Sequence, residues 1–169
     1  GALLRPARRP KGSEIAAHLR RLIRHNRRFW PATEILLVDS HHCTPQVLDL
    51  CDRIGLLYVF GLSKNTRLAA QVLPLEASTA ERYARSPGQK LRRFKTFSYA
   101  ARSWSKPRRV IARVEVSFRG RDTRYIVTNL EGGRGKHLYE KLYSARGQAE
   151  NHIKAWKTHL AADRTSCSK

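Results

Sequence analysis

The chain has 169 residues, and its 34 Lys and Arg against 13 Asp and Glu give a formal net charge of +21 at pH 7. Its composition, 41 per cent hydrophobic and 28 per cent charged, excludes a disordered chain, and the length suits one domain of about 100 to 200 residues. No apolar run approaches the roughly 18 residues of a membrane span. So much positive charge predicts a polyanionic partner, DNA or RNA.

The cysteines bear on the compartment. Cys43, Cys51 and Cys167 are an odd number, and the start of the chain shows no secretory signal. We therefore expect a reducing, cytoplasmic environment.

The first expected element is a basic amphipathic helix. Ser13 is a suitable N-cap, and the helical pattern ends near Trp30 and Pro31. Arginines occupy much of the surface beside the apolar stripe. The stripe consists of Ile15, Leu19, Leu22 and Ile23.

Two short apolar runs follow, EILLVD at 34–39 and LLYVFGL at 56–62, and each is typical of a buried strand. Between them a helix is expected after Thr44, stopped by Gly55. Helix and strand alternating at this spacing predict parallel neighbours, because parallel strands need a crossover of about ten or more residues. The fold class expected is therefore α/β.

The middle of the chain reads as an insertion. The stretch 65–86 has a helical pattern, but Pro74 predicts that it is broken into two pieces. Three runs, 91–100, 108–118 and 124–129, alternate apolar and polar residues as strands do. Together they predict a basic antiparallel meander placed between elements of the parallel sheet.

After GGRG at 132–135, a last helical region is expected from about 136 to 161. Gly147 is its weak point, costing about 1 kcal/mol relative to Ala. Four residues spaced by three, four and seven fall on one stripe of this helix: Tyr143, Arg146, Glu150 and Lys157. The stripe is either a solvated, salt-bridged surface or the face of an active site.

Two carboxylates are candidates for metal chemistry. Asp39 ends a predicted strand, where ligands gather in open α/β sheets, although with Ser40 it could simply start a turn. Glu150 could pair with Arg146 and Lys154 on a helix surface. Phosphodiester chemistry with two cations needs carboxylates that converge from separate elements, and Asp39 and Glu150 meet that requirement. Both alternatives stay open on these observations.

The spacing from Tyr143 through Arg146 and Glu150 to Lys157 matches the signature of DDE-type insertion-sequence transposases. Along nearly the whole chain, further segments resemble landmarks of one subgroup, the transposase DDE domain group 1 family. They are LLRP, ILLVDS, LLYVFGLSKNTRL, RRFKTFSYAARSWSKPRRVIARVEV, IVTNL, LYEKLYSARGQAENHIKAWK and ADRTSC.

The resemblance implies a ribonuclease H-like core formed by residues 1–62 and 136–169. A helical and β-meander subdomain, 63–135, would be inserted before the last catalytic helix. Asp39 would match the second catalytic carboxylate and Glu150 the third, both as ligands of Mg²⁺ or Mn²⁺, with two ions in the intact enzyme.

The resemblance also implies how the protein would meet DNA. Tyr143, Arg146 and Lys157 match positions expected to contact phosphates near the scissile bond. Trp104 would stack on an unpaired base, or else pack into the meander. The implied function is metal-dependent cleavage and strand transfer during transposition of an insertion element, acting on element ends and target DNA at the bacterial nucleoid. An oligomer on DNA stays open.

Two departures from the family pattern affect the expected activity. Val38 and His41 flank Asp39 and Ser40 where the family has glycines, which removes backbone freedom beside a metal ligand. The family's first catalytic Asp lies upstream of the LLRP landmark, where this chain begins.

Asp49 and Asp52 do not replace the first Asp, because both lie on the helix that follows Asp39. We therefore expect negligible nicking or strand transfer by this chain alone. The alternatives are a non-catalytic, basic nucleic-acid-binding remnant and a basic structural RNA-binding protein.

Overall fold

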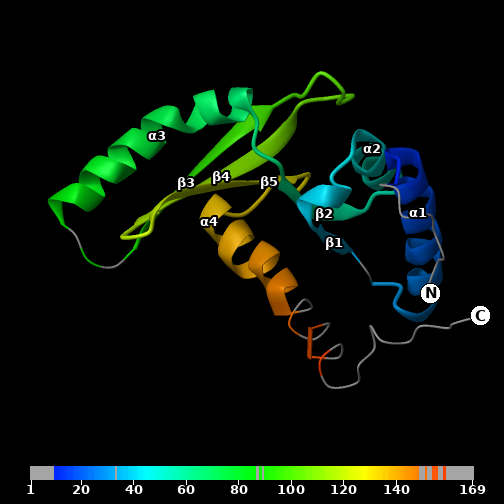
Figure 1. The fold of residues 1–169 in the computed structure, drawn as a ribbon. Coiled ribbons are helices and arrows are strands. Elements are labelled where there is room, and N and C mark those ends of the chain that lie inside the picture. The colour runs from blue at the N-terminus through cyan, green and yellow to red at the C-terminus, as the bar shows by residue number, and fades with distance from the viewer. Residues whose placement is uncertain are drawn as a thin grey trace, which may run out of the picture.

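One five-stranded sheet organises the molecule in the computed structural model, which describes residues 10–32, 34–86, 88, 90–148, 151, 154–155 and 158 (Figure 1). The strands are β1 Ile35–Val38, β2 Leu57–Leu62, β3 Leu91–Tyr99, β4 Arg108–Ser117 and β5 Gly120–Thr128. The helices are α1 Gly12–Phe29, α2 Pro45–Arg53, α3 Thr66–Arg85 and α4 Gly135–His137. Three short helical turns complete the set: η1 Ser40–His42, η2 Leu138–Leu142 and η3 Tyr143–Ala145.

The order of the strands is β1-β2-β5-β4-β3. β1 and β2 are parallel, with Ile35 opposite Leu57 and Val38 opposite Phe60, which confirms the predicted α/β pair. The three later strands form the predicted antiparallel meander, and β5 also pairs antiparallel with β2. The meander therefore continues the sheet of the parallel pair. The proposed split into a core (1–62 and 136–169) and an inserted subdomain (63–135) stays a prediction.

Each face of the sheet has its own core. On one face α1, α2 and α3 bury a large cluster around Tyr58 and Phe60. On the other face the segment that begins with α4 buries Leu138 and Tyr139 against Ile111 and neighbouring strand residues. Figure 1 shows α3 and the α4 segment on opposite sides of the sheet. Because side chains alternate along a strand, one β4 residue faces α3 and the next faces α4.

The start of α1 differs from the prediction. Lys11, not Ser13, is the N-cap, and its backbone N–H donates to Glu14 Oε2 over 2.9 Å. A carboxylate in the first turn thus satisfies a backbone donor that the helix leaves without a partner. Ser13 lies inside the helix.

The predicted break at Pro74 was wrong, because α3 is one continuous helix of 20 residues. A proline inside a helix costs about 3 kcal/mol or more. Here its ring is exposed, and the helix buries Leu68 and Val72 on one side of it and Thr79 on the other. Packing of both halves against the same sheet outweighs the lost hydrogen bond.

β1 is also less buried than predicted. Ile35 is 36 per cent exposed and the other three residues are half-buried. In the described part of the chain β1 has a single neighbour, β2, so it forms an edge of the sheet. β2 has partners on both sides and buries four of its six residues, as predicted.

Arg108, at the start of β4, is a buried cation that links the meander to α2. It is 4 per cent exposed, and its guanidinium donates to Asp52, to Asp49 Oδ1 at 2.8 Å and to Tyr58 Oη at 2.8 Å. Lys106 Nζ lies 3.2 Å from Asp52. Burial raises the pKa of Asp52, but hydrogen bonds from Arg108 and Lys106 outweigh it and hold this pKa below the ordinary 3.8.

Replacing Arg108 with Met leaves Asp49 without its cation and Asp52 with Lys106 alone. We expect a loss of about 3–5 kcal/mol in the free energy of unfolding, measured by urea denaturation, since a broken buried ion pair leaves unpaired charge. Arg82→Met, at an exposed position on α3, is the control and should change stability by less than about 0.5 kcal/mol. Equal effects of the two variants would contradict the proposed role of Arg108.

The pH dependence of stability reports on Asp52. Its folded pKa is lowered, so its charge stabilises the fold above pH 3.8 and this contribution is lost as the pH falls further. The stability difference between the wild type and Asp52→Asn should be constant above about pH 5 and shrink towards about pH 3. Denaturation curves over this range test it, and a difference that does not depend on pH would show that the carboxylate charge is unimportant.

Candidate active site

Asp39 lies at the carboxyl end of β1, as predicted. It is the N-cap of the η1 turn, where its Oδ1 accepts a hydrogen bond from Ser40 N at 2.6 Å. Its side chain is 43 per cent exposed. Because β1 and β2 are parallel, their carboxyl ends meet at one edge of the sheet, and Lys64 follows β2 at this edge.

The helical segment that begins with α4 approaches this edge from one face of the sheet. Its π-helical turn, η2, is followed by the 3-10 turn η3, and Tyr139 and Tyr143 lie with ring centroids 5.6 Å apart. Gly61 of β2 makes the approach possible. A Cβ there would lie 2.6 Å from Tyr143 Oη and 2.9 Å from Ser40 N, closer than real Cβ contacts allow.

Arg146 joins this segment to Asp39. Its Nη1 lies 3.9 Å from Asp39 Oδ2, and its guanidinium lies 5.3 Å from the centroid of the Tyr143 ring. Tyr143 and Arg146 therefore share one side of the segment, as their spacing predicted. The other two members of the stripe, Glu150 and Lys157, lie outside the described residues.

These side chains surround a cavity of about 250 Å³. It is lined by Asp39, Ser40, Gly61, Leu62, Lys64, Thr123, Arg124, Tyr125, Tyr139, Tyr143 and Arg146. Among the described residues of this lining there are three cations, Lys64, Arg124 and Arg146, and one carboxylate. The cavity is net positive and suits an anion such as a phosphate.

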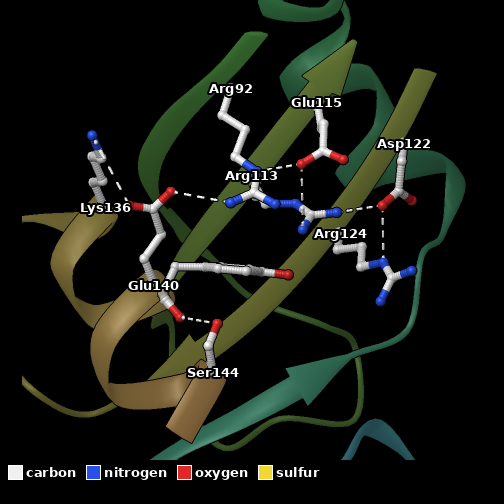
Figure 2. A network of polar contacts seen from close by, with 9 residues as sticks. Arg92, Arg113, Glu115, Asp122, Arg124, Lys136, Glu140 and Ser144 are labelled. Atoms are coloured by element: carbon white, nitrogen blue, oxygen red, sulfur yellow. Dashed lines mark hydrogen bonds and ion pairs between the residues drawn. The ribbon is translucent and has the colours of Figure 1, made fainter. Parts of the chain in front are cut away.

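A polar network fixes the helical segment on the meander (Figure 2). Arg113 of β4 pairs with Asp122 of β5, and its guanidinium lies 5.4 Å from the centroid of the Tyr139 ring. Arg92 of β3 pairs with Glu115 and reaches Glu140 of η2 at 3.5 Å. All three strands of the meander thus contribute to holding the segment over the cavity.

Arg109 binds the backbone of the loop between β5 and α4. Its Nη1 donates to the carbonyl oxygens of Leu130, Glu131 and Gly132 at 2.8 to 2.9 Å, and its Nη2 donates to that of Gly133 at 2.7 Å. Gly133 has φ +82°, a left-handed backbone that favours glycine. One side chain of β4 therefore orders four successive loop carbonyls.

Trp104 lies apart from this cavity and is absent from its described lining. It is half-buried, with its ring edge-on to Tyr99 at 5.5 Å and 5.9 Å from the Arg108 guanidinium. These contacts correspond to the alternative of an aromatic packed into the meander. Base stacking by Trp104 stays a prediction.

Sequence reasoning missed several residues of the cavity. Lys64 could have been found by the same rule as Asp39, since it follows the neighbouring parallel strand. Thr123 and Arg124 come from β5, and only the pairing of β5 with β2 brings them to Asp39. No local pattern indicates that pairing.

The described residues fit a divalent cation only in part. Asp39 supplies one carboxylate ligand of the kind that Mg²⁺ prefers, and within the described part of the chain no group of three or more His, Cys, Asp or Glu could hold a metal ion. Burial raises the pKa of Cys43 and of Cys51 to about 12.

Comparison with known protein families matches the chain over residues 1–169 to the family described as transposase DDE domain group 1. The chain belongs to this family. Membership implies an enzyme of the transposase kind, which acts on DNA and generally uses divalent metal ions. The mixed α/β structure is compatible with the fold of a DDE transposase.

No curated protein and no solved structure matches the chain. Among the described helices, none has the length and apolar character needed to cross a membrane.

Gly61→Ala tests the close approach at the cavity. The added Cβ meets Ser40 backbone and the Tyr143 hydroxyl, so we expect a loss of about 1–3 kcal/mol in unfolding free energy and a shift in the fluorescence of the cavity tyrosines. Gly147→Ala is the matched control, because nothing lies within 4 Å of its Cβ position, and it should be neutral or stabilising by about 1 kcal/mol. A Gly61→Ala protein as stable as the wild type would show that the packing at Gly61 is not tight.

Proposed function

We propose that this chain carries catalytic residues of an insertion-element transposase, which cleaves a DNA strand at the element ends and transfers it to target DNA. The observation that carries the proposal is the contact between Arg146 and Asp39. Two landmarks far apart in the sequence, a strand-end aspartate and a helical signature, line one cavity.

The charges of the cavity support a phosphodiester substrate. Lys64, Arg124 and Arg146 surround Asp39, and guanidinium groups bind phosphate oxygens through paired N–H donors. In the proposed complex the Arg146 guanidinium leaves its ion pair with Asp39 and binds the phosphate beside the scissile bond. The Tyr143 ring makes a cation–π contact with the Arg146 guanidinium and helps to hold it in place.

Glu150 is the proposed partner of Asp39. It follows Arg146 by four residues, the spacing at which helical side chains share a face. Asp39 and Glu150 would hold Mg²⁺ or Mn²⁺, and two such ions supply activation of the attacking water or 3′-hydroxyl and stabilisation of the leaving oxygen. Lys157, on the same stripe, is the proposed second phosphate contact.

A non-catalytic DNA-binding remnant is the second candidate. It is favoured by the partners that Asp39 already has, since Ser40 N–H donates to one carboxylate oxygen and Arg146 lies near the other. Val38 and His41, where the family has glycines, point the same way. In this case the cavity binds phosphate but holds no divalent ion at Asp39.

Titration with paramagnetic Mn²⁺ separates the two candidates. We expect selective broadening of the amide resonances of Asp39 and Ser40, because a bound ion relaxes nearby protons, and its loss in both Asp39→Asn and Glu150→Gln. Glu81→Gln on α3, an exposed carboxylate outside the cavity, is the matched control and should retain the broadening.

Absence of selective broadening in the wild type would contradict the catalytic proposal and favour the remnant. The same preparations test the expectation that this chain alone has negligible activity. Mg²⁺-dependent nicking of plasmid DNA that Glu150→Gln abolishes would overturn that expectation.

A further inference from the structure

A second basic surface lies between α1 and α2. The two helices form a groove of about 460 Å³ whose apolar floor includes Ile23 and Leu50. Four arginines line it: Arg20, Arg24, Arg27 and Arg53. We propose that this α1–α2 groove binds the phosphate backbone of duplex DNA, as a site separate from the Asp39 cavity.

The arginines of the groove converge from two helices. Arg20, Arg24 and Arg27 are spaced by four and three residues, so they form one stripe on α1. Arg53 faces them from the last turn of α2. In the part of the chain that the structure describes, no ion pair involves any of these four. By contrast, the Arg108 guanidinium donates to the carboxylates of Asp49 and Asp52.

Such an arrangement is unfavourable without an anion. Like charges at this spacing on a helix repel one another. No carboxylate is among the groove's described lining residues. A ligand with several negative charges would offset the repulsion and release its own counterions.

The spacing of the stripe favours a nucleic acid backbone. Seven residues of helix separate Arg20 from Arg27, which is about 10 Å, or about three base steps of one DNA strand. Guanidinium forks suit phosphate oxygens better than ammonium groups do. DNA, on which transposases act, is the polyanion that the family membership supplies.

The groove and the Asp39 cavity share no lining residue. α1 and α2 belong to the cluster on one face of the sheet, whereas Tyr139 and Tyr143 line the cavity from the other. DNA bound in the groove would therefore be held away from the cleavage point, and this binding needs no metal ion.

Two matched double variants of α1 test the groove. Arg20→Gln/Arg27→Gln removes two groove arginines, and Arg21→Gln/Arg28→Gln removes two exposed arginines that do not line it. In both variants the two substitutions lie on α1, seven residues apart, and remove two positive charges. Binding is measured by fluorescence anisotropy with an arbitrary duplex of about 30 base pairs, without divalent ions, at several salt concentrations.

We expect Arg20→Gln/Arg27→Gln to weaken binding about tenfold at 0.1 M salt and to reduce the slope of log affinity against log salt by about 2, since each phosphate contact contributes about 0.9. Arg21→Gln/Arg28→Gln should weaken binding less than about threefold. Arg53→Gln, on the other wall, should reduce the slope by about 1. Circular dichroism checks that each variant is folded. If Arg20→Gln/Arg27→Gln unfolds, the double variant Arg24→Gln/Arg53→Gln replaces it in the same binding measurement.

Equal losses in the two α1 variants, or no effect of Arg53→Gln, would overturn the proposal, since the arginines would then act as diffuse charge. Unchanged DNA binding in all variants would also overturn it and favour an acidic protein segment as the occupant. These results do not depend on Mn²⁺ binding at Asp39. Failure of the groove and failure of the proposed catalytic function are therefore distinguishable.

Discussion

Antiparallel pairing of β5 with β2 is the constraint on which the rest of the structure depends. It joins the meander to the parallel pair in one sheet, and Thr128 and Asn129 secure the junction through hydrogen bonds to the backbone of Tyr58 at 2.6 and 2.8 Å. The same pairing brings Arg124 to the edge where Asp39 ends β1. It also allows Arg108 of β4 to reach α2. Without this junction, the cavity would lose one wall and the buried cation its partners.

Local patterns predicted much of the fold and some of the residues that line the Asp39 cavity. Alternation and short apolar runs gave the strands, because a half-buried strand repeats every two residues. Asp39 was found by its position after a strand. The predicted break at Pro74 was wrong, and two features were not predicted at all: the use of Asp49 and Asp52 to hold Arg108, and the Gly61 position against which Tyr143 packs. All three depend on contacts between segments distant in sequence. Propensity describes none of these, since each is decided by the surface that the element packs against.

The large positive charge is divided between two uses. Arg92, Arg108 and Arg113 are paired with carboxylates of neighbouring elements, so they act as structural groups. The arginines around Asp39 and those of the α1–α2 groove border open cavities on different faces. Composition alone indicates a polyanionic partner, and only the structure separates the cations that tie elements of the fold together from those that border a cavity.

The four carbonyls held by Arg109 have a mechanical consequence. One guanidinium on β4 bonds four successive carbonyls of the loop before α4, so a bend of that loop would have to break these hydrogen bonds. While these bonds hold, the segment bearing Tyr143 and Arg146 is tied to the meander as one unit. A deformation of the meander by a bound ligand would therefore displace the Arg146 side chain relative to Asp39.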